Sequence, residues 1–184
     1  MTFNKHSDLA GAHAILSPSK YHWLNYTEDK LRATYLNQQA IQRGTELHQF
    51  ACDSIRLGIN LPKARKTLNM YINDAIGYKM IPEVTLVFSC NCFGTADAIS
   101  FRNNMLRIHD LKTGDTPAHM EQLDIYAGLF CLEYGVKPKN IRAELRIYQN
   151  DKIVVHNPES EDIQAIMDKI VSSDRIIERM KREV

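Results

Sequence analysis

The sequence lacks the features that mark exported or membrane-embedded proteins. No basic N-terminal segment leads into an apolar run, and no stretch approaches the roughly 18 consecutive apolar residues of a membrane span. We therefore expect a cytoplasmic protein that has no membrane contact. Helicase motifs and a Gly-x-x-x-x-Gly-Lys-Ser/Thr phosphate loop are absent as well, so any ATP-driven strand separation must come from another polypeptide.

The sequence also lacks paired cysteine motifs and carries little net charge. Cys52, Cys90, Cys92 and Cys131 do not form a paired Cys-x-x-Cys framework, which favours reduced thiols, and Cys90-x-Cys92 alone is a weak zinc pattern. The formal net charge of +1 neither requires nor excludes a nucleic-acid partner, because acids elsewhere can balance a basic groove. Composition is therefore silent about partners.

The length and the apolar content indicate one domain. The chain has 184 residues, of which 44% are hydrophobic, and this suffices for one substantial core. No internal repeat or linker divides it. We expect residues 1–184 to form a single domain in which residues 1–16 are a loosely held arm.

Capping residues and apolar periodicity predict the helices and strands. Helices are expected from Ser17-Pro18 through Leu24, over about 29–57 with an interruption at Gly44, over 62–77, from Pro117 to near Gly135, and from Asn157-Pro158 to near the C-terminus. Strands are expected at 84–88, 95–101, 105–112, 141–149 and 152–156. About five strands among these helices predict an α/β protein with a mixed sheet flanked by helices on both faces.

The strands at 95–101 and 105–112 are expected to form a hairpin. Asn103 and Asn104 between them tolerate the positive φ of a two-residue primed turn. This turn pairs Ile99 with Ile108 and, further along, brings Asp97 opposite Asp110. Both acids then share a face with the apolar residues of the hairpin, the face expected to be buried, whereas Ser100, Arg107 and His109 point the other way.

Two opposed carboxylates repel each other, so protein stability gives no reason for the pair formed by Asp97 and Asp110. A divalent cation would give one, because hard cations take carboxylate oxygens. Lys112 lies two residues beyond Asp110 on the same face, where its charge can hold a water or a phosphate oxygen. The alternative is an acid pair that reaches solvent, with Lys112 as its ion-pair partner.

Several other side chains have both a functional and a structural interpretation. His48 lies on the inward stripe of its predicted helix, as a ligand or as a satisfied core residue. Gln122 and Tyr126 lie one turn apart where an apolar stripe meets the polar side. Glu83, before the first strand, is a third possible acid. The cluster of Lys63, Arg65 and Lys66 is a solvated face or a DNA contact.

These residues follow an ordered set of motifs: Arg43-Gly-Thr-Glu-Leu-His48, Glu83, Gly94-Thr-Ala-Asp97, Asp110-Leu-Lys-Thr-Gly114, then Gln122 and Tyr126. Each motif is weak alone. Together, over residues 43–126, they resemble the RecB-type branch of the PD-(D/E)XK nucleases, a superfamily to which phage lambda exonuclease also belongs. The resemblance implies a restriction-endonuclease-like core and a bacterial or phage origin.

The resemblance also implies roles for individual residues. His48, Asp97 and Asp110 would ligate Mg²⁺ or Mn²⁺ together with the backbone carbonyl of Leu111. Lys112 would position or activate the attacking water. Gln122 and Tyr126 would orient the DNA backbone or support the site. Some members of the branch bind an iron–sulfur cluster through cysteines near the C-terminus, but no cysteine follows Cys131, so no cluster is expected.

We therefore expect a metal-dependent deoxyribonuclease, most simply an exonuclease, that acts in DNA processing, recombination or repair. Its partners would be DNA and, in addition, a helicase, a recombination protein or a second copy of the chain. Arg43, Lys63, Arg65 and Lys66 are the candidate DNA contacts. The alternative is a catalytically silent nuclease fold that serves as a DNA- or protein-binding subunit.

Overall fold

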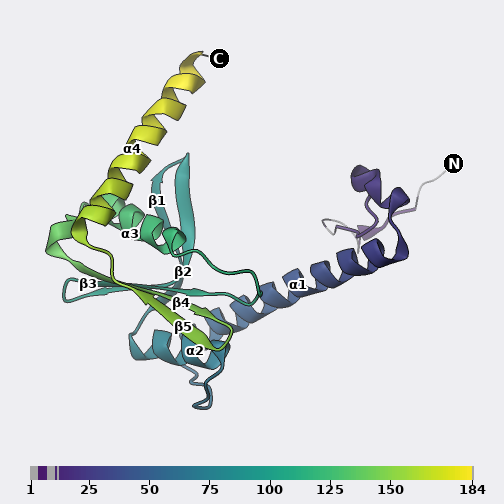
Figure 1. Ribbon diagram of the computed structural model, residues 1–184, viewed down its shortest axis with the longest axis horizontal. Helices are drawn as coiled ribbons and strands as arrows, with labels where there is room; N and C mark the ends of the chain where they lie inside the picture. Colours follow the sequence, from purple (N-terminus) through teal and green to yellow (C-terminus); the bar gives the residue numbers. More distant parts are fainter. Residues whose placement is uncertain (1–3, 8–10, 12, 184) are drawn as a thin grey trace. The chain divides into compact units, whose positions relative to one another are not determined.

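The computed structural model describes residues 4–7, 11 and 13–183 (Figure 1). They fall into two compact units, Met1–Thr45 and Glu46–Val184. The first unit contains the 3-10 helix η2 (Pro18–Asn25) and the start of helix α1 (Glu28–Leu57). The predicted arm at 1–16 belongs to this unit, and its residues 1–3, 8–10 and 12 lie outside the described residues.

The second unit is built on a five-stranded sheet whose spatial order follows the sequence. Its strands are β1 (Ile81–Ser89), β2 (Cys92–Arg102), β3 (Met105–Leu111), β4 (Arg142–Gln149) and β5 (Lys152–His156). Strands β3 and β4 are parallel, and the other neighbouring pairs are antiparallel. The crossover between β3 and β4 contains helix α3 (Glu121–Tyr134), as a parallel connection requires.

Helices cover both faces of this sheet, as the sequence predicts. Helices α3 and α4 (Ser160–Glu183) pack on one face over a cluster that includes Ile99 and Ile108. Helix α2 (Thr67–Gly77) and the end of α1 pack on the other face, over Ala98 and Leu111. The expectation that only one face of the β2–β3 hairpin is buried is wrong, because His109 on the second face is 0% exposed.

The β2–β3 hairpin has the predicted turn and register. Asn103 and Asn104 have φ values of 50° and 57°, and Ile99 pairs with Ile108. A second turn of the same kind, at Asn150 and Asp151, joins β4 to β5 with φ values of 51° and 57°. Both turns could be predicted because asparagine and aspartate tolerate the left-handed region better than most residues.

Helix α1 corrects one prediction. It runs without a break through Gly44, and the Thr45 hydroxyl donates to the carbonyl of Ile41 instead of capping a new helix. A glycine costs only about 1 kcal/mol inside a helix, and no proline follows to stop the chain. Gly58, with φ of 67°, ends the helix as expected.

Two helices begin later than the sequence predicts. Helix α2 begins at Thr67 and not near residue 62, because Asp151 from the β4–β5 turn accepts the Thr67 N–H at 2.9 Å. Helix α3 begins at Glu121 and not at Pro117, because Gln149 holds the preceding segment as a loop through the carbonyls of Gly114 and Thr116. Both restraints come from residues distant in the sequence.

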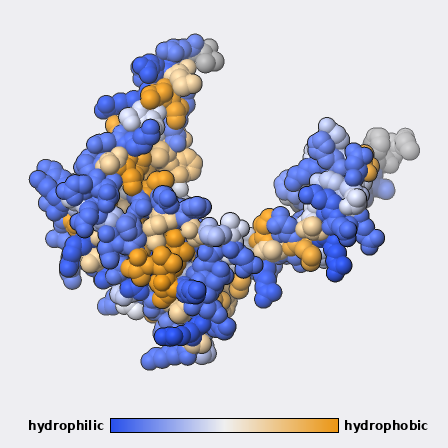
Figure 2. All heavy atoms as spheres, in the orientation of Figure 1, coloured by the Kyte–Doolittle hydropathy of each residue, from blue (hydrophilic) through white to orange (hydrophobic). Residues whose placement is uncertain are grey.

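Polar and charged residues cover most of the visible surface, while apolar residues gather over part of the sheet and along α4 (Figure 2). Val154 and Val155 in β5 and Ile176, Ile177 and Met180 in α4 are among the exposed apolar side chains. Within the described part of the chain, none of the helices has both the length and the hydrophobicity needed to cross a bilayer.

Candidate active site

Strand β2 changes the direction of its side chains at Asp97. Ala96 and Ile99 both pack in the cluster under α3 and α4, although strict alternation would send residues three apart to opposite faces. The neighbouring strand is distorted at the same level, since Glu83 lies between two ladder pairs and has φ of 55°. A positive φ is uncommon for a residue with a side chain, so β1 and β2 share a bend at these two acids.

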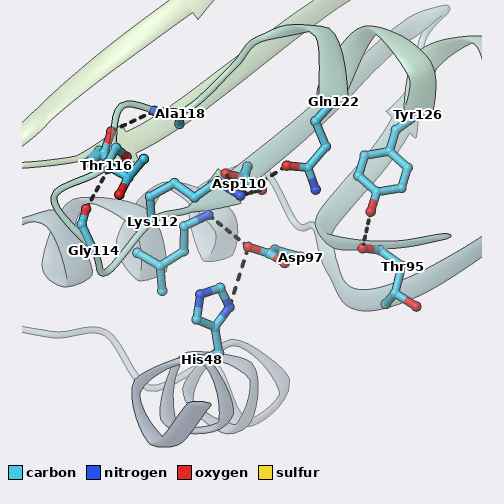
Figure 3. Close-up of polar contacts among 12 residues, drawn as sticks. His48, Thr95, Asp97, Asp110, Lys112, Gly114, Thr116, Ala118, Gln122 and Tyr126 are labelled. Carbon is cyan, nitrogen blue, oxygen red and sulfur yellow. Dashed lines mark hydrogen bonds and ion pairs between the residues drawn. The ribbon is translucent and has the colours of Figure 1, made fainter. Parts of the chain in front are cut away.

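This bend brings three potential metal ligands together. One ligand atom each from His48 in α1, Glu83 in β1 and Asp97 in β2 lies within 4.8 Å of the others. The Nδ1 atom of His48 is 3.5 Å from Oδ2 of Asp97 (Figure 3). Carboxylates and an imidazole suit a divalent cation such as Mn²⁺ or Mg²⁺, and Glu83 thus joins the predicted ligands.

Asp110 lies at the end of β3 and is 3% exposed. The Nζ atom of Lys112 is 3.1 Å from each of its carboxylate oxygens, and the hydrogen bond is made to Oδ1. In the described part of the chain, the buried Oδ2 of Asp110 has no hydrogen-bond partner. This oxygen has the charge of Lys112 beside it but accepts no hydrogen bond, so a bound cation would give it a further partner.

Lys112 is held between two elements of the unit. Besides Asp110, its Nζ donates to Oε1 of Gln122 in α3 at 3.0 Å. The Lys112 backbone N–H donates to the carbonyl of Tyr148 in β4, and the preceding N–H of Leu111 donates to Asp97. The segment that would offer the Leu111 carbonyl to a metal is therefore fixed on both sides.

Burial makes both aspartates reluctant to ionise, and the charge of Asp110 adds to this effect at Asp97. Burial and the negative charge of Asp110 raise the pKa of Asp97 to about 6, against the Leu111 N–H and His48, which favour its charged form. Burial also raises the pKa of Asp110, against the opposing effect of the Lys112 ammonium. Such shifts are typical of carboxylates that share a site for positive charge.

Tyr126 holds the bent strand in place. Its hydroxyl donates to the carbonyl of Thr95 at 2.7 Å, two residues before Asp97. A Cβ atom added at Gly94 would lie 3.0 Å from the Tyr126 ring, so the ring needs a glycine beneath it. The predicted roles of Tyr126 were to orient the DNA backbone or to support the site, and these contacts are those of a supporting residue.

The basic candidates do not form one group. Arg43 is exposed in the first compact unit. Lys63 and Arg65 line a separate cavity beside α2. The ammonium of Lys66 forms an ion pair with Asp151 at 2.8 Å, so it already has a partner within the protein. The sequence cluster therefore separates into residues with different surroundings.

Two supporting residues were not predicted. Tyr148 receives the Lys112 N–H and packs beside the buried His109. Gln149 binds the loop after Lys112 through Gly114, Thr116 and Ala118. Both lie on β4, whose pairing with β3 is parallel and distant in the sequence, so no local pattern could have indicated them.

Comparison with known proteins leaves the chain without a family. No protein-family model matches it, and no curated protein matches it. Among solved structures, the crystal structure of SSO0001 is similar at 16% sequence identity and a TM-score of 0.39, over 85% of this chain and 68% of that chain. A likeness this weak carries no argument about fold or function.

Proposed function

We propose that the chain is a divalent-metal-dependent deoxyribonuclease, most simply an exonuclease in DNA processing, recombination or repair. The observation that carries this proposal is the convergence of His48, Glu83 and Asp97 within 4.8 Å, with Asp110 and Lys112 at the neighbouring strand end. The restriction-endonuclease-like class of the fold, inferred from the motifs, belongs to the same proposal.

The residues present fit a Mg²⁺ or Mn²⁺ ion. His48, Asp97 and Asp110 would hold it, with Glu83 as a further carboxylate and the Leu111 carbonyl as a neutral oxygen ligand. The donor set contains oxygens and one imidazole, and Oδ2 of Asp110, which accepts no hydrogen bond among the described residues, supplies a buried acceptor. When bound, such an ion supplies Lewis-acid polarisation of a phosphodiester.

Lys112 supplies the second requirement for phosphodiester hydrolysis. An ammonium has three N–H donors, and hydrogen bonds to Asp110 and Gln122 engage two of them. The third is left for a water or a phosphate oxygen. A positive charge in this position stabilises negative charge that grows on the phosphate, and Gln122 fixes its direction.

Strand separation lies outside this proposal. This sequence has no ATP-binding phosphate loop, so a helicase or a recombination protein would deliver separated strands to the site, and a second copy of the chain is a further proposed partner. The basic side chains of Arg43, Lys63 and Arg65 are the proposed electrostatic contacts to DNA.

The test is a nuclease assay on linear, nicked, circular and single-stranded DNA with Mg²⁺, with Mn²⁺ and with EDTA. We expect cleavage with either metal, none in EDTA, and resistance of closed circles if ends are required. DNA binding without cleavage under all metal conditions would contradict the enzyme and favour a silent DNA-binding subunit. If the chain neither binds nor cleaves DNA, both the nuclease and the silent DNA-binding subunit are contradicted.

A further inference from the structure

A cavity of about 300 Å³ opens beside Lys112. Its apolar lining consists of Leu47, Leu68 and Leu111 from three different elements. Leu47 directly precedes His48, and Leu111 directly follows Asp110, so the cavity adjoins two of the proposed ligands. Thr67 and the β4–β5 turn also line the cavity.

The two charged residues that line the cavity, Lys112 and Asp151, differ in how far their charges are already paired. Asp151 accepts from the Thr67 N–H at 2.9 Å and from Lys66 at 2.8 Å, so the Lys66 ammonium largely neutralises it. Lys112 keeps one N–H donor beyond its hydrogen bonds to Asp110 and Gln122. A phosphate is therefore favoured next to Lys112, and the rest of the lining suits an uncharged group.

The cavity also has hydrogen-bonding capacity that the fold does not use. Among the described residues, no hydrogen bond engages the side-chain amide of Asn150 or the hydroxyl of Thr113, and both residues line it. An amide offers two donors and an acceptor, a combination that matches the edge of a nucleobase. The leucine walls suit the apolar faces of such a ring.

We propose that this cavity holds the unpaired base of the nucleotide that adjoins the scissile phosphate. The proposal rests on the proposed nuclease function and names its substrate: DNA with an unstacked nucleotide at the cleaved position. Unpairing a base costs a few kcal/mol in a duplex and least in a single strand. Single-stranded and frayed ends are therefore the preferred substrates.

The experiment uses oligonucleotides with 2-aminopurine at the 5′ or the 3′ terminal position, with the full chain in EDTA so that no cleavage occurs. This base fluoresces weakly when it is stacked and strongly when it is unstacked. No aromatic side chain lines the cavity to quench it. We expect fluorescence to rise on binding for one of the two label positions and to remain low for a label ten nucleotides inside a duplex.

Two variants test the location. Leu68→Trp fills the cavity and should abolish the fluorescence rise and weaken binding of the single-stranded oligonucleotide; the affinity is measured as well, because the new indole would itself quench a base bound beside it. Asn150→Gly removes the amide but keeps the positive φ of the turn, and should weaken binding of the single-stranded oligonucleotide by about fivefold or more. Asn103→Gly is the matched control, because it makes the same change in the β2–β3 turn outside the cavity lining and should bind like the parent.

A fluorescence rise that survives Leu68→Trp would overturn the proposal, and so would parental affinity in Asn150→Gly. Cleavage with Mn²⁺ is measured on the same samples. Metal-dependent cleavage without any terminal-base signal would overturn the cavity assignment and leave the nuclease intact. A terminal-base signal without cleavage would support base binding and contradict the nuclease.

Discussion

The backbone N–H of Leu111 donates a hydrogen bond of 2.9 Å to Oδ2 of Asp97, beyond the point where the β2–β3 ladder ends at Ala98 and His109. The same carboxylate oxygen lies 3.5 Å from Nδ1 of His48. One side chain therefore joins the two strands to α1. Changes at Asp97 are expected to alter both metal binding and strand pairing, so the other acids give cleaner tests of the metal site.

Asp110→Ala and Glu83→Gln should each weaken Mn²⁺ binding by about tenfold or more, because each removes a charged oxygen ligand. Isothermal titration calorimetry measures the affinity directly. Asp168→Asn, which removes an exposed acid of α4, is the control and should bind like the parent. Parental Mn²⁺ affinity in Asp110→Ala would exclude Asp110 from the ligand set.

In EDTA, Asp97→Asn should stabilise the protein near neutral pH. The folded pKa of about 6 lies above the ordinary value of 3.8, so folded Asp97 keeps a proton that the unfolded chain releases, and stability falls as pH rises between these values. The gain in the variant should be near zero below pH 4 and reach at most about 3 kcal/mol by pH 7.

Denaturant unfolding of the parent and Asp97→Asn at each pH measures this difference. The comparison between the two proteins is required because buried His109, whose pKa is lowered to about 3 by burial and by Arg146 and Arg107, makes stability rise with pH over part of the same range. Saturating Mn²⁺ should reverse the order of stabilities. A pH-independent difference in EDTA would contradict the interpretation.

The sequence predicts the parts of this site that depend on local geometry. Asn103 and Asn104 fix the hairpin turn, the turn fixes the register, and the register places Asp97 near Asp110. The bend at Asp97 and the positive φ of Glu83 could not be read from the sequence, because neither residue is a glycine and Pro82 before Glu83 restricts its own φ and not that of Glu83. They bring Glu83 into the ligand group, where the sequence offered only a possible helper.

The predicted starts of α2 and α3 were wrong for a related physical reason. A capping residue next to a helix is visible in the sequence, whereas Asp151 caps α2 from a position 84 residues away from Thr67. Gln149 likewise displaces the start of α3. The hairpin turns were predicted correctly because the determining residues lie within the turns themselves, whereas the starts of α2 and α3 were missed because a distant turn and strand β4 supply the contacts.

Lys112→Ala should keep the fold, Mn²⁺ binding and DNA binding, while cleavage falls by about a hundredfold or more, as expected for loss of one electrostatic stabiliser of the transition state. Lys112→Arg should restore little, because a planar guanidinium does not replace a compact ammonium between Asp110 and Gln122. Single-turnover cleavage and DNA affinity are measured on the same preparations. Near-parental cleavage in Lys112→Ala would remove Lys112 from the chemistry.

Gly94→Ala should destabilise the protein by about 1–3 kcal/mol, because its new methyl group would press on the Tyr126 ring at 3.0 Å. Tyr126→Phe loses only the hydrogen bond to Thr95 and should cost about 1 kcal/mol. Combining Gly94→Ala with Tyr126→Ala should relieve the clash. The double variant should therefore lose less stability than the sum of the losses in Gly94→Ala alone and Tyr126→Ala alone. Additive losses in thermal unfolding would show that the two positions do not meet.

DNA affinity should fall with salt, and Lys63→Gln and Arg65→Gln should each reduce the slope of log affinity against log salt by about 0.9 if each residue contacts one duplex phosphate. Lys66→Gln should change the slope less, because Asp151 already neutralises that ammonium. Titrations in EDTA over a range of salt concentrations provide the slopes. An affinity that does not depend on salt would rule out an electrostatic groove.

The single parallel pair, β3 with β4, also has a consequence for the order of folding. Strands β1, β2 and β3 are consecutive antiparallel neighbours that can pair through short loops, whereas β4 joins β3 only after the crossover through α3 has formed. Closing such a crossover is slow compared with forming a hairpin. Hydrogen-exchange pulse labelling should therefore find protection at Ser100 and Arg107, an opposed pair of the β2–β3 ladder, earlier than at the Lys112 N–H, whose acceptor is the Tyr148 carbonyl. In a nascent chain Asp97 and Asp110 would meet before Lys112 is fixed.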